Sequence, residues 1–402
     1  MSSAPIIIIG AGPAGLLAAI AAGKQALVLE RNPYPGKKLL LSGSGQCNFT
    51  NALDNDDFLF HLRSASHFLK PALYAFDKDA FIDLLAREGC GSAKREDGKY
   101  FPETKHSASV RDALYQAAVK SGAKFSFDTH VSSVSKQAGG GFAVKTDKTV
   151  ISADRIILAT GGKSYTQTGS DGLGYVIAKS LGHKIEPLTP ALASVDLIPA
   201  SRFTDCAGIS LKNVPIAFCS PQGRIKDRGD LLFTHTGLSG PVILNNAFLI
   251  KAGSSIAISF VEGGAHKLQD LVLQEPKKSL QTALKAFALP TALIARILGY
   301  LAIDGSQQLA QLKSKDRNLL GAYLQNAVFH VKSVESFETA MATAGGIDLA
   351  DIRIRTMESR ICPKLYFAGE ILNYHAPTGG FNIQLAASTG WLAGSSAVLP
   401  PS

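Results

Sequence analysis

Three glycines and one carboxylate near the start of the chain have the spacing of a nucleotide-binding site. Gly10, Gly12 and Gly15 follow a run of isoleucines, and Glu30 lies 20 positions after the first glycine. The first glycine permits a tight turn, the second lets the backbone approach a pyrophosphate, and the third lets a helix pack closely on a sheet. A carboxylate at this distance accepts hydrogen bonds from the hydroxyls of a ribose. These residues predict a site for a dinucleotide that contains adenosine, and the alternative is a purely structural glycine turn.

A strand–helix–strand unit has to hold these residues in place. The apolar run 5–9 has the composition of a buried strand, an alanine-rich helix follows the glycines, and 27–29 form a second strand. The free N–H groups and the positive dipole end of the helix would then face the phosphates. The later run 151–160 ends at a glycine pair, Gly161 and Gly162. Glycines at the carboxyl end of such a strand let main chain approach a ligand there.

The composition is that of a globular protein with two or three domains. Of the 402 residues, 46% are hydrophobic and 18% are charged, so the chain can bury a large core. The first residues lack the basic region of a signal peptide, and the apolar stretch 283–301 contains Lys285, Pro290 and Arg296, so we expect core helices there and no membrane partner. The five cysteines form no CxxC pair, which argues against disulfides and a metal site and predicts a cytoplasmic protein. They are Cys47, Cys90, Cys206, Cys219 and Cys362.

The charge balance favours an anionic partner. The net charge is +9 and the isoelectric point is about 9.2, which suits a polyanion. The alternative is that the basic residues lie on ordinary solvated faces, because no run of them is dense or mixed with aromatic residues. The candidates are Arg224, Lys226 and Arg228, followed by Lys313, Lys315 and Arg317.

Hydrophobic periodicity and breakers predict an α/β chain with β-rich and helical stretches in its middle. We expect helices where apolar residues recur at helical spacing, strands in short β-branched runs, and a return to α/β character at the end. The predicted helices are 77–88 with Asp77 as N-cap, 107–120, 267–330 with breaks at Pro276 and Pro290, and 383–393. The predicted strands are 125–134, 142–146, 151–160 and 364–370, with further β structure over 187–260.

Five motifs, which occur in order along the whole chain, resemble those of the BaiN-type flavoprotein family, also called aminoacetone-oxidase-like. The resemblance implies FAD as the bound cofactor and a Rossmann-like FAD-binding domain built from 1–188 and 336–402. It also implies two insertions, a β-barrel-like domain at 189–265 and a small helical domain at 266–335. The motifs are GAGPAG with Glu30, GKKLLLSGSGQCNFTN (36–51), LATGGKSYTQTGSDGLGY (158–175), GDLLFTHTGLSGP (229–241) and LYFAGEILNYHAPTGGFNIQLAASTGWLAG (365–394).

The same resemblance implies which residues surround FAD. The glycines of 10–15 would face the pyrophosphate, 42–48 would line the flavin, and 379–382 would present backbone N–H groups to the isoalloxazine. A helix N-terminus there would stabilise the negative charge of reduced flavin. The complete set is Gly10, Gly12, Pro13, Ala14, Gly15, Glu30, Arg31, Lys38, Ser42, Gly43, Gly45, Cys47, Asn48, Thr160, Gly161, Gly162, Gly369, Glu370, Gly379, Gly380, Phe381 and Asn382.

Three side chains near these motifs are candidates for catalysis. Cys47 lies in the implied flavin loop, where a thiol could protonate the carbon that does not receive hydride; its alternative role is that of a small packing residue. His235, in the GDLLFTHTGLSGP motif, could donate a proton or bind an anion, or simply be a satisfied loop histidine. His375 precedes the last glycine-rich helix start and could face the flavin.

The resulting functional hypothesis is an FAD-dependent oxidoreductase that passes hydride from NAD(P)H to a polarised C=C bond. The resemblance admits steroid-like enones, a uracil base of ribosomal RNA, and amine oxidation with oxygen as acceptor. The basic balance favours the RNA substrate, and the leading alternative is an oxidase of aminoacetone or a similar amine. A non-catalytic flavin-containing RNA-binding protein and an NAD-dependent dehydrogenase remain open. Because no second glycine fingerprint is present, an NAD(P)H site would be transient or built differently, and the oligomeric state stays open.

Overall fold

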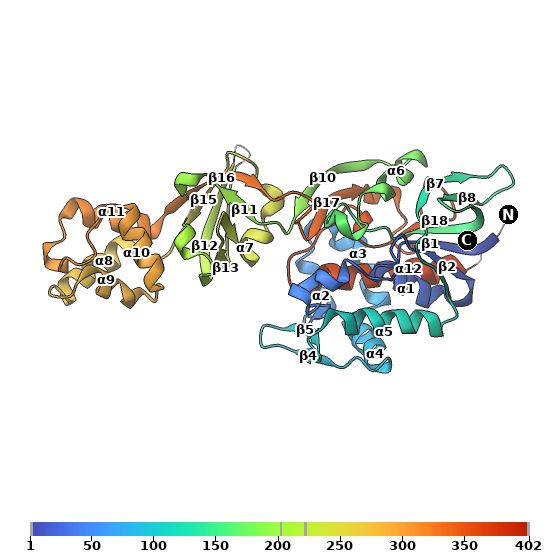
Figure 1. Ribbon diagram of the computed structural model, residues 1–402, viewed down its shortest axis with the longest axis horizontal. Coiled ribbons are helices and arrows are strands. Elements are labelled where there is room, and N and C mark those ends of the chain that lie inside the picture. Colours follow the sequence, from blue (N-terminus) through green and yellow to red (C-terminus); the bar gives the residue numbers. More distant parts are fainter. Residues whose placement is uncertain (1–2, 202, 221–222, 400–402) are drawn as a thin grey trace. The chain divides into compact units, whose positions relative to one another are not determined.

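The computed structural model describes residues 3–201, 203–220 and 223–399, which form two compact units (Figure 1). The first unit combines 1–191 with 337–402, and the second spans 192–336. The chain therefore leaves the first unit once and returns to it. The further division of the second unit at 265 into a β-rich and a helical domain stays a prediction.

A parallel sheet assembled from both ends of the chain is the centre of the first unit. Its strands follow the order β6-β2-β1-β9, and β18 also pairs with β9. All of these pairs are parallel, with Ile6 opposite Ala26 and Leu365 opposite Ile156. The antiparallel strands β8 and β7 extend the sheet, and the predicted α/β fold with a Rossmann-type domain is confirmed. The strands are β1 Ser3–Ile9, β2 Ala26–Leu29, β6 Lys124–Ser126, β7 Val131–Lys136, β8 Phe142–Thr146, β9 Val150–Leu158 and β18 Leu365–Phe367.

Two helices from opposite ends of the chain pack on each other without intervening side chains. They are α1 (Pro13–Ala22) and α12 (Phe381–Val398), the blue and red helices that lie together in Figure 1. A Cβ added at Gly390 would lie 2.1 Å from the Ala14 carbonyl oxygen, and one at Gly394 would lie 2.3 Å from that of Ala18. Glycines four residues apart thus let the backbones touch, which fixes α1 and the loop that precedes it.

The remaining elements of the first unit surround this sheet. Asp77 caps α4, as predicted, by accepting a hydrogen bond from the backbone N–H of Ala80. The helices are α2 Asn55–Phe60, α3 Ser66–Ala75, α4 Lys78–Arg87, α5 Ser107–Lys120 and α6 Leu173–Ser180. The strands outside the main sheet are β3 Thr50–Asn51, β4 Ser92–Lys94, β5 Lys99–Pro102, β10 Ile185–Ala191 and β17 Ala342–Ile347.

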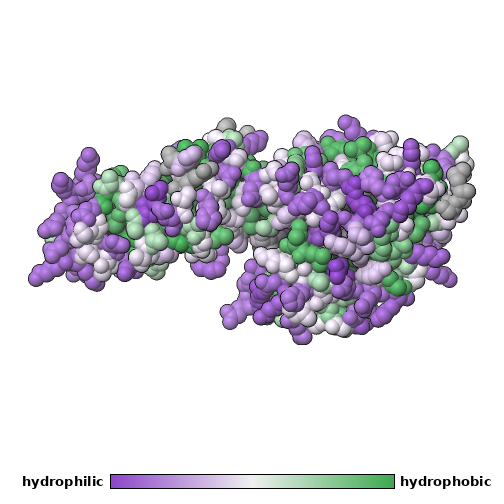
Figure 2. Space-filling view, viewed as in Figure 1, coloured by the Kyte–Doolittle hydropathy of each residue, from purple (hydrophilic) through white to green (hydrophobic). Residues whose placement is uncertain are grey.

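The second unit contains a closed barrel of strand order β11-β14-β13-β12-β15-β16, in which β16 pairs with β11. Its interior is filled by side chains such as Phe218, Ile256 and Phe329. Helices α8 to α11 follow β15, and polar side chains gather over them in Figure 2. The elements are β11 Val195–Leu197, β12 Ser210–Ser220, β13 Gly223–Phe233, β14 Gly237–Ser239, α7 Pro241–Leu244, β15 Ser255–Ile258, α8 Gly264–Gln274, α9 Leu280–Ala283, α10 Thr291–Tyr300, α11 Ser314–Gln325 and β16 Ala327–Val334.

Several predicted elements have different limits in the structure. The run 125–134 contains a turn that separates β6 from β7, and the helical prediction for 267–330 is wrong at its end, because Ala327 begins strand β16. The predicted strand 364–370 shortens to β18, while the final helix extends beyond 383–393 to cover α12. None of the helices within the described ranges has the length and apolar character needed to cross a bilayer.

Candidate cofactor site

A pocket lies where four parallel strands of the first unit end. Its lining includes Ile9 at the end of β1, Leu29 at the end of β2, Ala159 just after β9 and Ala368 just after β18. Open parallel sheets bind ligands in the crevice outside the carboxyl ends of their strands. The pocket therefore has the position expected of a nucleotide site in this fold.

The three glycines of the N-terminal motif have different physical reasons to be glycine. Gly10 has φ of 103°, and a Cβ there would lie 2.5 Å from the Ala159 carbonyl oxygen; a Cβ at Gly15 would lie 1.9 Å from the Gly10 carbonyl oxygen. These two are required by the fold. A Cβ at Gly12, in contrast, would meet no heavy atom within 4 Å, so no steric contact in the described protein accounts for the absence of a side chain. The open space at Gly12 faces the pocket and fits an approaching pyrophosphate.

Glu30 is held rigidly at the end of β2, where it lines the pocket. One carboxylate oxygen accepts the backbone N–H of Ala11 at 2.8 Å, and the other accepts the backbone N–H and the side-chain amide of Asn32 at 2.8 and 2.7 Å. The side chain is only 7% exposed. A carboxylate offers about four acceptor positions, so this one can be oriented by the protein and still accept ribose hydroxyls.

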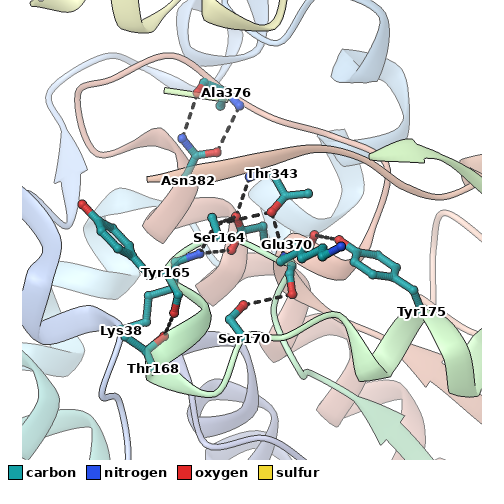
Figure 3. Close-up of polar contacts among 12 residues, drawn as sticks. Lys38, Ser164, Tyr165, Thr168, Ser170, Tyr175, Thr343, Glu370, Ala376 and Asn382 are labelled. Carbon is teal, nitrogen blue, oxygen red and sulfur yellow. Dashed lines mark hydrogen bonds and ion pairs between the residues drawn. The ribbon is translucent and has the colours of Figure 1, made fainter. Parts of the chain in front are cut away.

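A second carboxylate that lines the pocket is fixed by residues from four separate segments (Figure 3). Glu370, directly after β18, accepts from the Lys38 ammonium at 2.5 Å and from the Ser164 hydroxyl at 2.9 Å. It also accepts from the Thr343 backbone N–H at 2.8 Å, and Lys38 reaches Ser164 at 2.6 Å. The Tyr175 hydroxyl donates to the Glu370 backbone carbonyl oxygen at 3.2 Å. This network brings together positions more than 300 residues apart.

The start of α12 is also held in one conformation. Gly380 is its N-cap with φ of 90°, and a Cβ there would lie 2.6 Å from the backbone of Thr50. Asn382 accepts from the Ala376 N–H at 3.0 Å and donates to the Ala376 carbonyl at 2.8 Å (Figure 3). The Asn51 amide donates to the Gly379 carbonyl at 3.1 Å. The first-turn N–H groups of α12, which have no intrahelical partners, are therefore preorganised for an electron-rich ligand.

The loop 42–48 adopts a strained backbone. Gly43, Ser44, Gly45 and Cys47 all have positive φ, which costs energy at the two non-glycine positions. The Cys47 thiol is fully buried in the hydrophobic core, and this burial raises its pKa to about 12. Burial of the neutral thiol favours the alternative role of a small packing residue, and a catalytic role for Cys47 stays a prediction. Asn48 donates from its side-chain amide to the carbonyl oxygens of Thr50 and Tyr100.

The two histidine candidates lie in different units. His235 is exposed between β13 and β14 in the second unit, and His375 is half-buried in the segment before α12 in the first. Neither lines the pocket described above. Their catalytic roles stay predictions.

The structure separates the predicted FAD residues into two groups. One group lines the pocket: Gly10, Gly12, Pro13, Ala14, Glu30, Arg31, Lys38, Thr160, Gly161, Gly369 and Glu370. The other lies outside its lining: Gly15, Ser42, Gly43, Gly45, Cys47, Asn48, Gly162, Gly379, Gly380, Phe381 and Asn382. Sequence reasoning missed the lining at 129–131 and 168–171. The Arg31 guanidinium reaches the Asp171 carboxylate at 2.5 Å, and no local pattern in the sequence indicates that pair.

The pocket has the chemistry that an FAD molecule requires at its adenosine and pyrophosphate end. It offers a helix N-terminus with open space at Gly12 and an oriented carboxylate at Glu30. Glu370 and Lys38, which are hydrogen-bonded to each other, also line it. The fold and this site define a dinucleotide-binding flavoprotein of the Rossmann type.

Comparison with known proteins identifies the family. The family model described as HI0933-like protein Rossmann domain matches residues 4–396, so the chain belongs to this family, and the resemblance noted from the motifs is confirmed. A ribosomal RNA dihydrouridine synthase of Escherichia coli is 32% identical over 392 residues, with 96% of each chain covered. A 3-dehydro-bile acid delta(4,6)-reductase of Clostridium scindens is 29% identical over 415 residues, with 98% of this chain and 99% of the reductase covered.

Solved structures agree on the fold. The 3-ketosteroid-delta4-(5alpha)-dehydrogenase from Rhodococcus jostii RHA1, in complex with 4-androstene-3,17-dione, matches with a TM-score of 0.51 at 15% identity. The match covers 99% of this chain and 97% of the dehydrogenase. The chain therefore shares the fold of this dehydrogenase.

Proposed function

We propose that the protein is an FAD-dependent reductase that uses NAD(P)H to reduce a polarised C=C bond, with a uracil base of ribosomal RNA as its substrate. The observation that carries the proposal is the pocket at Gly12, Glu30 and Glu370, which suits a dinucleotide cofactor. FAD, when bound, supplies hydride transfer.

The names of the two curated relatives support the type of bond. Formation of dihydrouridine adds two hydrogens across a uracil C=C bond that is conjugated to a carbonyl, and a delta(4,6)-reductase acts on C=C bonds. Both names describe reduction of carbon–carbon double bonds in otherwise unrelated molecules. The net charge of +9 favours a polyanionic RNA over a bile acid, which carries a single carboxylate.

The residues of the chain would bind and orient the cofactor. The N-terminus of α1 at Gly12 would hold the pyrophosphate, and Glu30 would accept the ribose hydroxyls. Glu370, held by Lys38, Ser164 and the Thr343 backbone, would fix the ribityl and pyrophosphate part of FAD. The N–H groups at the start of α12 would stabilise negative charge that develops on the flavin.

Two measurements test the proposal. The purified protein should be yellow, and anaerobic NADPH or NADH should bleach its absorbance near 450 nm. Ribosomal RNA from a strain that lacks the protein should lose dihydrouridine, and a plasmid copy should restore it. Bleaching by aminoacetone instead of NAD(P)H would support the amine oxidase, and unchanged dihydrouridine in the deletion strain would refute the RNA substrate.

A further inference from the structure

The outer face of the barrel joins residues from four neighbouring strands into one surface. Arg224 on β13 lies opposite Cys219 on β12, Cys219 lies opposite Ser255 on β15, and Ser255 lies opposite His330 on β16. Directly paired residues of antiparallel strands project from the same side of a sheet. These four residues therefore form one row across the barrel wall.

A parallel row lies two residues along the strands. Lys226 is opposite Ala217, Ala217 is opposite Ala257, and Ala257 is opposite Val328. Between the two rows, Phe218 on β12, Ile256 on β15 and Phe329 on β16 belong to the hydrophobic core of the second unit, whereas Ile225 on β13 is exposed. Ala217 and Ala257 are small and are only 6% and 8% exposed. Since alternate residues of a strand face opposite sides, both rows face outward.

This surface has the cations Arg224 and Lys226 at one margin and Lys332 at the other, with small side chains between them. Arg224 and Lys226 are exposed on β13, and His330 and Lys332 are exposed on β16. The two margins are three strand spacings apart, roughly 14 Å. Lys251 adds an exposed cation in the loop that leads into β15. The middle strands carry nothing larger than cysteine in these two rows, so a broad ligand can reach both margins.

The charges on this surface are available to a ligand. In the described part of the barrel, the ion pairs engage Lys212 with Asp230 and Arg228 with Glu262, and no such pair involves Arg224, Lys226 or Lys332. The second unit has 15 Lys and Arg against 10 Asp and Glu, a net charge of +5 out of +9 for the whole chain.

We propose that this outer barrel face, formed by Arg224, Lys226, His330 and Lys332 around the small residues of β12 and β15, binds the phosphodiester backbone of a folded RNA. Cations at two margins of the barrel wall match a ligand whose negative charges lie on two strands of backbone, as in the double-helical parts of RNA. The inference rests on the proposed function, because it assigns the docking surface for the RNA substrate.

The test measures RNA binding by the FAD-loaded protein as a function of salt. The probe is a fluorescently labelled, transcribed ribosomal RNA fragment, and the readout is anisotropy between 50 and 200 mM KCl. The test variant combines Arg224→Gln, Lys226→Gln and Lys332→Gln. Its matched control combines Lys285→Gln, Lys313→Gln and Lys315→Gln, which removes the same charge from exposed positions of the helical segment.

The slope of log affinity against log salt should fall by about 2 to 3 in the test variant, because each lost phosphate contact contributes about 0.7 to 0.9. The Kd should rise at least tenfold at 100 mM KCl, while the control stays within about twofold of wild type. Equal losses in test and control variants would show a net-charge effect only and would overturn the proposal. A test variant with unchanged affinity for RNA would overturn the proposal too. So would a test variant that keeps its affinity for RNA and loses only binding to vesicles of phosphatidylglycerol.

The outcome can be separated from that of the proposed function. Flavin absorbance and its bleaching by NADPH report on the cofactor unit and should be equal in wild type and both variants. Should the triple variant fail to fold, Lys226→Gln alone should lower the salt slope by about one. If dihydrouridine persists in the deletion strain, the proposed reaction fails, while the binding measurements still decide whether this face holds RNA.

Discussion

Replacing Gly12 by Ala separates a glycine needed by the ligand from glycines needed by the fold. A Cβ at this position would meet no heavy atom within 4 Å. The backbone has φ of −74° and ψ of −178°, which alanine adopts freely. Gly12 is the N-cap of α1, where alanine is less favourable than glycine, so we expect the free energy of unfolding of the apoprotein to fall by at most about 1 kcal/mol.

The same methyl group should strongly weaken FAD binding. It would occupy the space through which the main chain approaches the pyrophosphate. Forcing an extra methyl into a close-packed contact costs about 1–3 kcal/mol, which raises the Kd for FAD by about 5- to 150-fold. The measurement is titration of the apoprotein with FAD, followed by the quenching of flavin fluorescence, together with urea unfolding of the apoprotein.

Two other glycines provide the controls. Gly139 also has open space around it and is exposed away from the pocket, so Gly139→Ala should leave both measurements unchanged. Gly10→Ala should destabilise the apoprotein strongly, because its Cβ would lie 2.5 Å from the Ala159 carbonyl oxygen. If Gly12→Ala bound FAD as tightly as wild type, the pyrophosphate would not lie at the start of α1. A loss of stability in Gly12→Ala as large as in Gly10→Ala would show that the open space is needed by the fold.

Three further perturbations test other parts of the site. Lys38→Met removes one of three donors to the Glu370 carboxylate and should lower the free energy of unfolding by about 1–3 kcal/mol, which is less than the loss expected for a fully buried ion pair. In urea unfolding, the double variant with Glu370→Gln should lose less stability than the sum of the losses in the two single variants. Burial raises the pKa of the Cys47 thiol to about 12, so ionisation favours the unfolded chain above pH 9. Between pH 9 and 11, the free energy of unfolding of the wild type should fall by about 1.4 kcal/mol per pH unit more than that of Cys47→Ala. The turnover of Cys47→Ala at pH 7 should stay within about threefold of the wild-type value. Asn382→Ala removes the hydrogen bonds to Ala376 and should raise the Kd for FAD about tenfold, which the fluorescence titration measures.

Sequence reasoning located the parts of the site whose geometry is set by residues close together in the sequence. The spacing of Gly10, Gly12, Gly15 and Glu30 belongs to one strand–helix–strand unit, so its geometry follows from neighbouring residues alone. Helix α4 and its N-cap could be predicted because Asp77 directly precedes apolar residues that recur at helical spacing. In both cases the interactions that decide the structure lie within about 20 residues.

The parts that escaped prediction depend on contacts between distant segments. The small polar residues around Cys47 predicted a ligand loop, but they gave no sign of the positive φ at Gly43, Ser44, Gly45 and Cys47 or of the full burial of the thiol. Strand β16 alternates buried and exposed residues from Ala327 onward. The leucine spacing of the preceding helix continues close to this point, so the end of the helix was predicted too late in the sequence. The pair Arg31–Asp171 joins segments 140 residues apart, and a single sequence gives no sign of it.

The C-terminal segment completes a pocket that the N-terminal fingerprint begins. Ala14, in the first turn of α1, is contacted from two sides by late residues: a Cβ at Gly369 would lie 2.8 Å from the Ala14 Cβ, and one at Gly390 would lie 2.1 Å from its carbonyl oxygen. Glu370 in turn is fixed by Lys38. The helix N-terminus that would face the pyrophosphate is therefore positioned by strand β18 and helix α12. These contacts join both ends of the chain within the cofactor unit, and the residues that line the pocket belong to that unit.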